Sequence, residues 1–127
     1  MTRYVLMAAS TGDRALSFDV RYFEVAAGGY STLERHDHPH AVLVLSGRGQ
    51  VILDDEVSEL TPFDCVYVAP GTLHQFRAAP DEPLGFLCIV DRDRDKPAAA
   101  TPDDIARLCR NPVIAELLQT GRKLGPS

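Results

Sequence analysis

The sequence predicts an all-β domain, either a sandwich or a closed barrel, followed by two short helices. Runs rich in Val, Ile, Leu, Phe or Tyr recur through residues 1–90, and turns containing Gly, Pro or Asp separate them. Short strands at such even spacing are typical of β-sandwiches and barrels. The expected strands cover residues 4–9, 18–26, 41–45, 50–53, 65–68, 74–78 and 84–90.

Several aromatic and cysteine side chains in the strand-like runs are expected to face inward. We expect Tyr67, Phe76 and Phe86 to line the barrel, because each lies in a strand-like run. Cys65 and Cys88 lie in similar runs, and we expect both to be buried as small apolar side chains.

The character of the chain changes after residue 90. Residues 91–97 alternate in charge and are expected to form a solvated linker. Thr101 and Pro102 then have the pattern of an N-cap followed by proline at the first helical position. Asn111 and Pro112 repeat it before apolar residues at helical spacing, and Gly121 is expected to end this second helix. The chain therefore divides into a barrel over residues 1–92 and a tail of linker and helices over 93–127.

Composition narrows the possible compartments and partners. A chain of 127 residues with 45% apolar content suits one domain with its own core. The net charge of −5 and the lack of a long basic run argue against nucleic acid and anionic membranes as partners. The three widely spaced cysteines indicate a reducing compartment, and no segment approaches the ~20 apolar residues of a membrane span. The apolar stretch 4–9 is too short for a signal-peptide core, so we expect a cytoplasmic protein.

The histidines indicate a metal site. His36, His38 and His40 occupy alternate positions, and His74 follows the Pro-Gly turn at 70–71. A single buried histidine is more often a hydrogen-bonded core residue than a ligand, but random placement would rarely produce this cluster. Imidazoles close to a carboxylate, here Glu34, form a typical ligand set for a divalent transition metal such as Fe, Mn, Ni, Zn or Cu.

The spacing around these residues resembles the two sequence motifs of the cupins. Gly28, then five residues to Glu34-Arg35-His36, three more to His40 and six more to Gly47 fit the first motif, residues 28–47, without a gap. The family has His where Glu34 stands and Glu where His40 stands. In the second motif, residues 63–78, His74 follows Gly71 after two residues, as in the family. The first Gly and the last Asn of that motif are replaced by Phe63 and Ala78.

The resemblance implies a double-stranded β-helix, or jelly-roll barrel, with a metal inside that His36, His40 and His74 hold. The fourth ligand has two candidates. The gap-free spacing favours Glu34, which shares a strand face with His36. A shift of two residues would instead make His36 and His38 the first pair.

The sequence does not identify the catalytic residues or the reaction. The resemblance implies a small-molecule substrate in the barrel and two enzyme options, a dioxygenase or an isomerase of a sugar-like molecule. The motifs contain no pair of acid-base groups for isomerase chemistry, since Glu34 is the one such group near them. A dioxygenase-like reaction is therefore favoured. The alternative is a non-catalytic protein that binds or senses a small ligand through its metal.

A homodimer is also expected. The tail helices carry apolar stripes at Ile105 and Leu108 and over residues 113–118. Short helices need packing to be stable, either on their own barrel or on a partner. Docking on a partner is favoured, since two-fold pairs are the commonest homo-oligomers.

Overall fold

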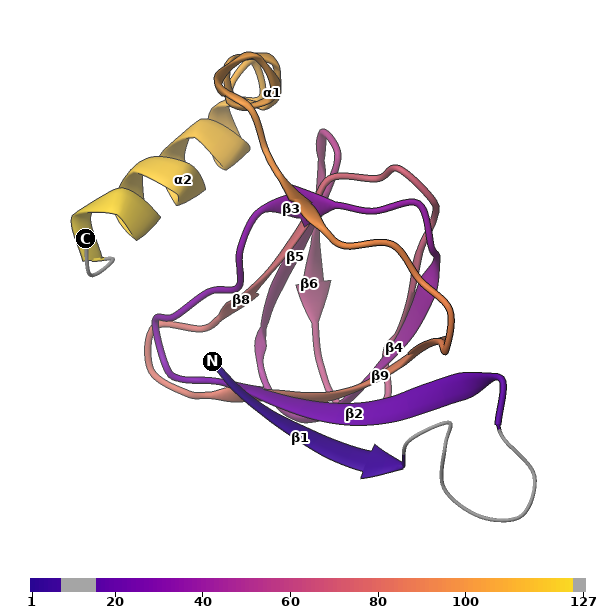
Figure 1. Ribbon diagram of the computed structural model, residues 1–127. Helices are drawn as coiled ribbons and strands as arrows, with labels where there is room; N and C mark the ends of the chain where they lie inside the picture. The colour runs from indigo at the N-terminus through magenta and orange to yellow at the C-terminus, as the bar shows by residue number, and fades with distance from the viewer. Residues whose placement is uncertain (8–15, 125–127) are drawn as a thin grey trace.

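Two five-stranded antiparallel sheets face each other and form the barrel (Figure 1). The computed structural model describes residues 1–7 and 16–124, with side chains through Gln119. In spatial order, the first sheet contains β1 (Thr2–Met7), β2 (Phe18–Val25), β9 (Leu84–Asp91), β4 (His40–Gly47) and β7 (Cys65–Val68). The second contains β10 (Ala98–Ala99), β3 (Glu34–Arg35), β8 (His74–Ala78), β5 (Gly49–Leu53) and β6 (Glu56–Leu60). The all-β jelly-roll class is confirmed.

Each expected strand is present, although residues 8 and 9 of the first lie outside the described residues. The sequence analysis missed β3, β6 and β10. β3 and β10 have only two residues each, and the edge strand β6 reads Glu-Val-Ser-Glu-Leu, which carries little apolar signal. These strands form through pairing with their neighbours, which a local pattern does not reveal.

The second sheet has a core on each of its faces. Val51 packs between the sheets with the main barrel cluster, which includes Val42 and Phe86. The next residue, Ile52, belongs to a separate cluster with Leu108 and Ile114 of the tail. Successive strand residues point to opposite faces, so β5 contributes to both cores.

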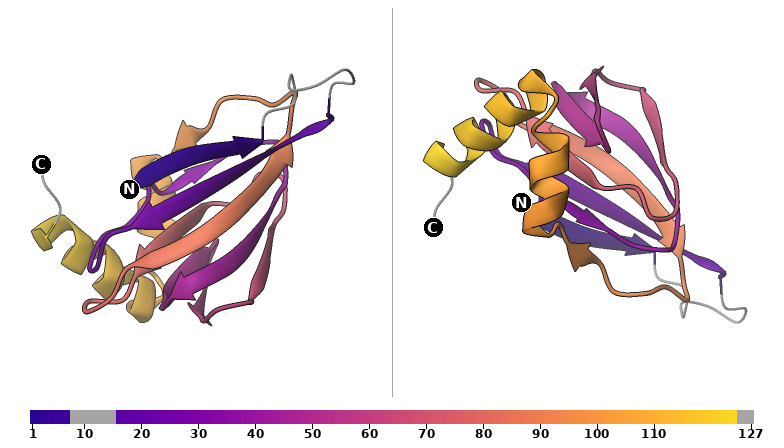
Figure 2. Two further views of the ribbon diagram at one scale, coloured as in Figure 1. Left: turned by 90° about the horizontal axis from the view of Figure 1, so that it is seen from below. Right: turned by 90° about the horizontal axis from the view of Figure 1, so that it is seen from above.

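The tail helices cover the outer face of this second sheet (Figures 1 and 2). α1 (Pro102–Leu108) begins with a capping box between Thr101 and Asp104, as its sequence pattern predicts. Asp104 also accepts a hydrogen bond from Arg35 on β3 at 2.8 Å. The Asn111 side chain donates to the Asp55 carbonyl oxygen at 2.9 Å at the start of α2 (Pro112–Leu124). The helices are therefore packed on and bonded to their own barrel.

Two expectations about the tail change with this packing. Gly121 does not end the second helix, which continues to Leu124. An interior glycine costs a helix only about 1 kcal/mol relative to alanine and does not have to terminate it. The apolar stripes also do not need a partner subunit, so the homodimer stays a prediction that has lost this support.

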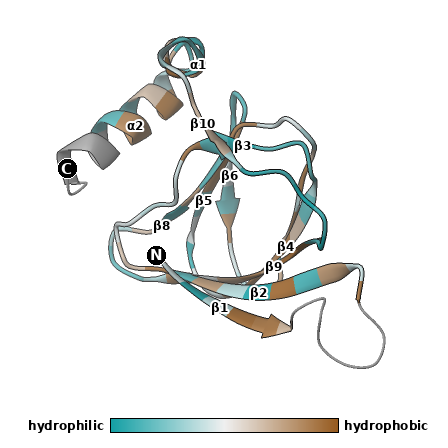
Figure 3. Cartoon of the chain, in the orientation of Figure 1, coloured by the Kyte–Doolittle hydropathy of each residue, from teal (hydrophilic) through white to brown (hydrophobic). Residues whose placement is uncertain are grey.

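The outer face of the first sheet carries exposed apolar side chains, and hydrophobic residues fill the second half of β1 (Figure 3). Tyr67 is 65% exposed there and Cys65 is also exposed, so the expectation that they face inward was wrong. β7 turns Val66 and Val68 toward the core instead. No helix in the described part of the chain is long and apolar enough to cross a membrane.

Candidate metal centre

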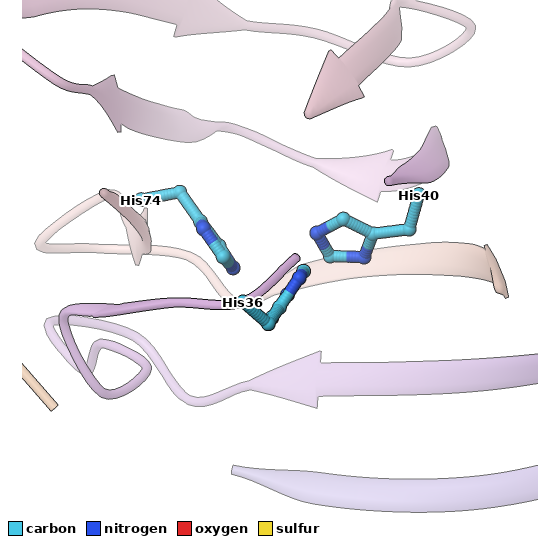
Figure 4. Close-up of side chains that lie close together, drawn as sticks. All are labelled: His36, His40 and His74. Carbon is cyan, nitrogen blue, oxygen red and sulfur yellow. The ribbon is translucent and has the colours of Figure 1, made fainter. Parts of the chain in front are cut away.

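His36, His40 and His74 point toward one another inside the barrel (Figure 4). One potential ligand atom from each ring lies within 4.8 Å of the other two. His40 begins β4 in the first sheet, His74 begins β8 in the second, and His36 follows β3. The cluster therefore joins both sheets and both sequence motifs.

Hydrogen bonds orient two of these rings. Nδ1 of His36 lies 2.6 Å from the His38 carbonyl oxygen, and Nδ1 of His74 lies 2.9 Å from the Thr72 carbonyl oxygen. A carbonyl oxygen only accepts, so each Nδ1 carries the proton and donates it. Each Nε2 then presents a free lone pair, which is the arrangement found in metal-binding histidines.

His40 supplies an independent indication of a ligand. Its Nδ1 lies 2.9 Å from Sγ of Cys88, while its Nε2 is buried and has no hydrogen-bond partner among the described residues. Buried polar atoms are nearly always satisfied. A metal ion bound by the three imidazoles would satisfy this nitrogen, so the residues present fit a divalent transition ion.

Burial keeps the three imidazoles neutral. It is the main reason that the pKa values of His36 and His74 are lowered, and it lowers the pKa of His40 to about 3 with further help from neighbouring imidazoles. A neutral imidazole is the form that binds metals. The folded chain therefore presents competent ligands at neutral pH.

The turn before His74 is tied to the first motif. Gly71 has φ +78° and donates its backbone N–H to the His36 carbonyl oxygen at 2.8 Å. The N–H of Leu73 donates to the Asp54 side chain at 3.1 Å. Glycine adopts this left-handed conformation without the steric cost that other residues have. The Pro-Gly turn thus positions His74 relative to His36.

Glu34 and His38 both line the same cavity but lie outside the three-histidine cluster. The His38 ring stacks on His36 with centroids 3.7 Å apart, and its Nδ1 lies 2.8 Å from Oδ1 of Asp95. Glu34 pairs with His74 in the β3–β8 register. Burial raises the pKa of the Glu34 carboxyl group, while His38 and Arg21 oppose that shift.

The cavity around the cluster has a volume of about 610 Å³ and three kinds of lining. Phe23, Phe76 and Phe86 stack into an apolar floor, with ring centroids 5.5 and 4.7 Å apart along the series Phe23–Phe86–Phe76. The Cys88 thiol also faces the cavity and is 2% exposed. The remaining wall is rich in charge and includes the cationic residues Arg3, Arg21, Arg92, Arg94 and Lys96.

The sequence analysis correctly predicted that Phe76 and Phe86 line the interior of the barrel. It overlooked the cationic wall of the cavity, and it did not predict that Cys88 lines the cavity. Alternation along β2 was the available signal for Arg21, since residues 19, 21 and 23 share a face. Arg92, Arg94 and Lys96 come from the segment expected to be a solvated linker, which borders the cavity.

Comparison with known proteins agrees with the fold and the motifs. Residues 21–90 match the family model described as the cupin domain. A 1-methylthio-D-xylulose 5-phosphate methylsulfurylase from Rhodospirillum rubrum is 45% identical over 118 residues, which cover 93% of this chain and 73% of that protein.

Solved structures give the same result. A cupin 2 domain-containing protein from Halorhodospira halophila has a TM-score of 0.85 at 52% identity, covering 91% of this chain and 80% of the other. A cupin-2 domain protein from Rhodospirillum rubrum also has a TM-score of 0.85, at 44% identity, and the match covers 93% of this chain and 77% of that one. The chain therefore belongs to the cupin family.

Proposed function

We propose that this protein is a metal-dependent enzyme that removes the methylthio group from a 1-methylthio ketose phosphate. The observation that carries the proposal is the 45% identity, over 93% of this chain, to a protein named as a methylsulfurylase of such a substrate. The three converging imidazoles and the cavity of about 610 Å³ provide a site of suitable chemistry and size. The dioxygenase-like reaction expected from the motifs finds no support in that relative's name.

The side chains divide the work between binding and chemistry. His36, His40 and His74 would hold the ion, which supplies a Lewis acid for a carbonyl oxygen when bound. Phe23, Phe76 and Phe86 line the cavity with an apolar floor, which would keep water from that side of a bound substrate. A ketose that binds there would present its carbonyl group toward the histidines.

Cys88 is positioned to accept the methylthio group. Its Sγ lines the cavity 2.9 Å from Nδ1 of His40, next to the proposed carbonyl position. Loss of the thiol proton and attack by the resulting Cys88 sulfur on the methylthio sulfur would form an S–S bond and break the C–S bond. The electron pair of the broken bond stays on the carbon beside the carbonyl, and a proton completes a methyl ketone. A second, low-molecular-weight thiol then reduces the mixed disulfide and restores Cys88.

The direct test supplies the metal-replete protein with 1-methylthio-D-xylulose 5-phosphate and dithiothreitol. We expect mass spectrometry to show loss of the methylthio group, with elemental analysis identifying the metal. Cys88→Ser should lower the turnover rate by at least about 100-fold, because a hydroxyl group is a much weaker nucleophile than a thiol. The metal content of this variant should equal that of the wild type. Unchanged substrate with the wild-type protein would contradict the proposal. Binding without turnover would favour the non-catalytic alternative.

For the fourth ligand, we propose Glu34 over His38. The His38 ring stacks on His36 and its centroid lies 6.3 Å from that of His40, whereas Glu34 lines the cavity as the neighbour of His74 in the β3–β8 ladder. Glu34→Ala should therefore lower the metal affinity roughly tenfold more than His38→Ala does. Loss of a residue that only hydrogen-bonds to a ligand already costs about 10- to 100-fold in affinity, and loss of a ligand should cost at least as much. Competition with a fluorescent chelator measures this difference, and the opposite order would assign the position to His38.

A further inference from the structure

Among the described residues, five cationic side chains border the cavity, and four of them have an evident explanation. Arg94 donates to the Asp19 carboxylate at 2.9 Å and to the Asp91 carbonyl oxygen at 2.7 Å. Arg92 lies 3.5 Å from the Asp93 carboxylate. Arg3 and Lys96 are exposed, so water solvates their charges. The positions of these four residues do not require a ligand.

Arg21 is the exception. Its side chain is half-buried, and its Nε is covered by protein without a hydrogen-bond partner among the described residues. Its contacts are a 3.5 Å approach of Nη2 to Sγ of Cys88 and a guanidinium position 5.2 Å from the centroid of the Phe23 ring. Across residues 1–7 and 16–119, no carboxylate forms an ion pair with it. A guanidinium is always charged, and burying it unpaired is costly.

The fold directs this unpaired charge into the cavity. Arg21 lies directly opposite Cys88 in the β2–β9 register and shares the inward face of β2 with Phe23. The guanidinium therefore lies beside the thiol and above the aromatic floor. Its remaining N–H donors are free to bind whatever enters the cavity, because the described protein atoms leave them unused.

We propose that Arg21 binds the phosphate group of the substrate. That the substrate carries a phosphate rests on the proposed function. That Arg21 binds it rests on the contacts of Arg21 in this structure. A planar guanidinium binds phosphate oxygens through two parallel charge-assisted hydrogen bonds. A phosphate monoester would supply acceptors for the N–H groups of Arg21 that have none among the described residues, and the ketose chain would bend so that its phosphate reaches Arg21 while its methylthio group lies at Cys88. Arg94 serves as a matched comparison, because it borders the same cavity but is already bonded to Asp19.

The test measures binding of D-xylulose 5-phosphate, which lacks the methylthio group and so cannot undergo its removal. Calorimetric titrations compare it with unphosphorylated D-xylulose on metal-replete wild-type protein, Arg21→Gln and Arg94→Gln. We expect Arg21→Gln to weaken binding of the phosphate ester by roughly 10- to 100-fold, which is the range for a lost charge-assisted hydrogen bond. D-Xylulose binding and metal content should not change. Arg94→Gln should change the affinity for the ester by less than about threefold, because the Arg94 guanidinium is already bonded to Asp19 and Asp91 and does not bind the phosphate.

Arg21→Lys controls for the possibility that Arg21→Gln weakens binding only because the protein misfolds. Arg21→Lys keeps the positive charge but loses the two-pronged geometry, and we expect an affinity for the ester between those of the wild type and Arg21→Gln. Wild-type affinity in Arg21→Lys, or equal losses in Arg21→Gln and Arg94→Gln, would overturn the proposal. So would wild-type protein that binds the ester no better than D-xylulose. Arg21-dependent binding of the ester by a protein without methylthio-removing activity would retain the phosphate site and refute only the proposed reaction.

Discussion

His74→Ala is expected to remove most of the bound metal. His74 is the member of the three-histidine cluster that begins a strand of the second sheet, and its Nε2 is oriented by the bond from Nδ1 to Thr72. Mutating only the outer hydrogen-bond partners of metal ligands typically costs 10- to 100-fold in affinity, so losing a ligand should cost about 100-fold or more. Elemental analysis and chelator competition measure the loss.

His38→Ala provides the matched control. It removes an imidazole that lines the same cavity and stacks on His36, but that lies outside the cluster. We expect this variant to retain much more metal than His74→Ala. Equal metal content in the two variants would show that the three-histidine cluster is not the binding site.

Leu108→Ala is expected to destabilise the fold by about 3 kcal/mol, within the range measured for buried leucines. Leu108 is 0% exposed and packs with Ile52, Leu73 and Ile114 between the tail and the second sheet. The loss is large compared with the 5–15 kcal/mol that typically stabilises a domain. Urea denaturation followed by circular dichroism measures it.

Val113→Ala is the control for this prediction. Val113 lies on α2 next to Ile114 but is 52% exposed, so we expect a change below about 0.5 kcal/mol. A Leu108→Ala protein as stable as Val113→Ala would mean that the tail does not pack on its own barrel in solution. Light scattering on the wild-type chain tests the predicted homodimer separately, since the tail no longer provides its cause.

The sequence predicted the barrel well because apolar strands and turn residues are local signals. It also placed His36, His40 and His74 together, since the motif spacing encodes which strand ends meet. Inward orientation was harder to predict. Phe76 faces the cavity while Tyr67 faces solvent, and only the pairing of β7 with β4 determines the orientation of Tyr67.

The features that the sequence analysis missed depend on contacts between distant residues. Asp95 binds His38 from 57 positions away, and Arg21 approaches Cys88 from 67 positions away. Neither pair forms a recognisable motif, because the intervening strands determine which side chains meet. The tail had the same limitation, since its stripes predicted packing without identifying the surface that they cover.

A metal ion held by the three histidines would also link the two sheets mechanically. His40 belongs to one sheet and His74 to the other, so an ion shared between them would act as a removable cross-link between the two sheets. Separation of the sheets would have to break a ligand bond, and a ligand present at 100 times its dissociation constant adds about 2.7 kcal/mol of stability. Stripping the metal should therefore speed amide hydrogen exchange first in the strand ends near His40 and His74. The Val44 and Val51 amides, deeper in the barrel, should respond less.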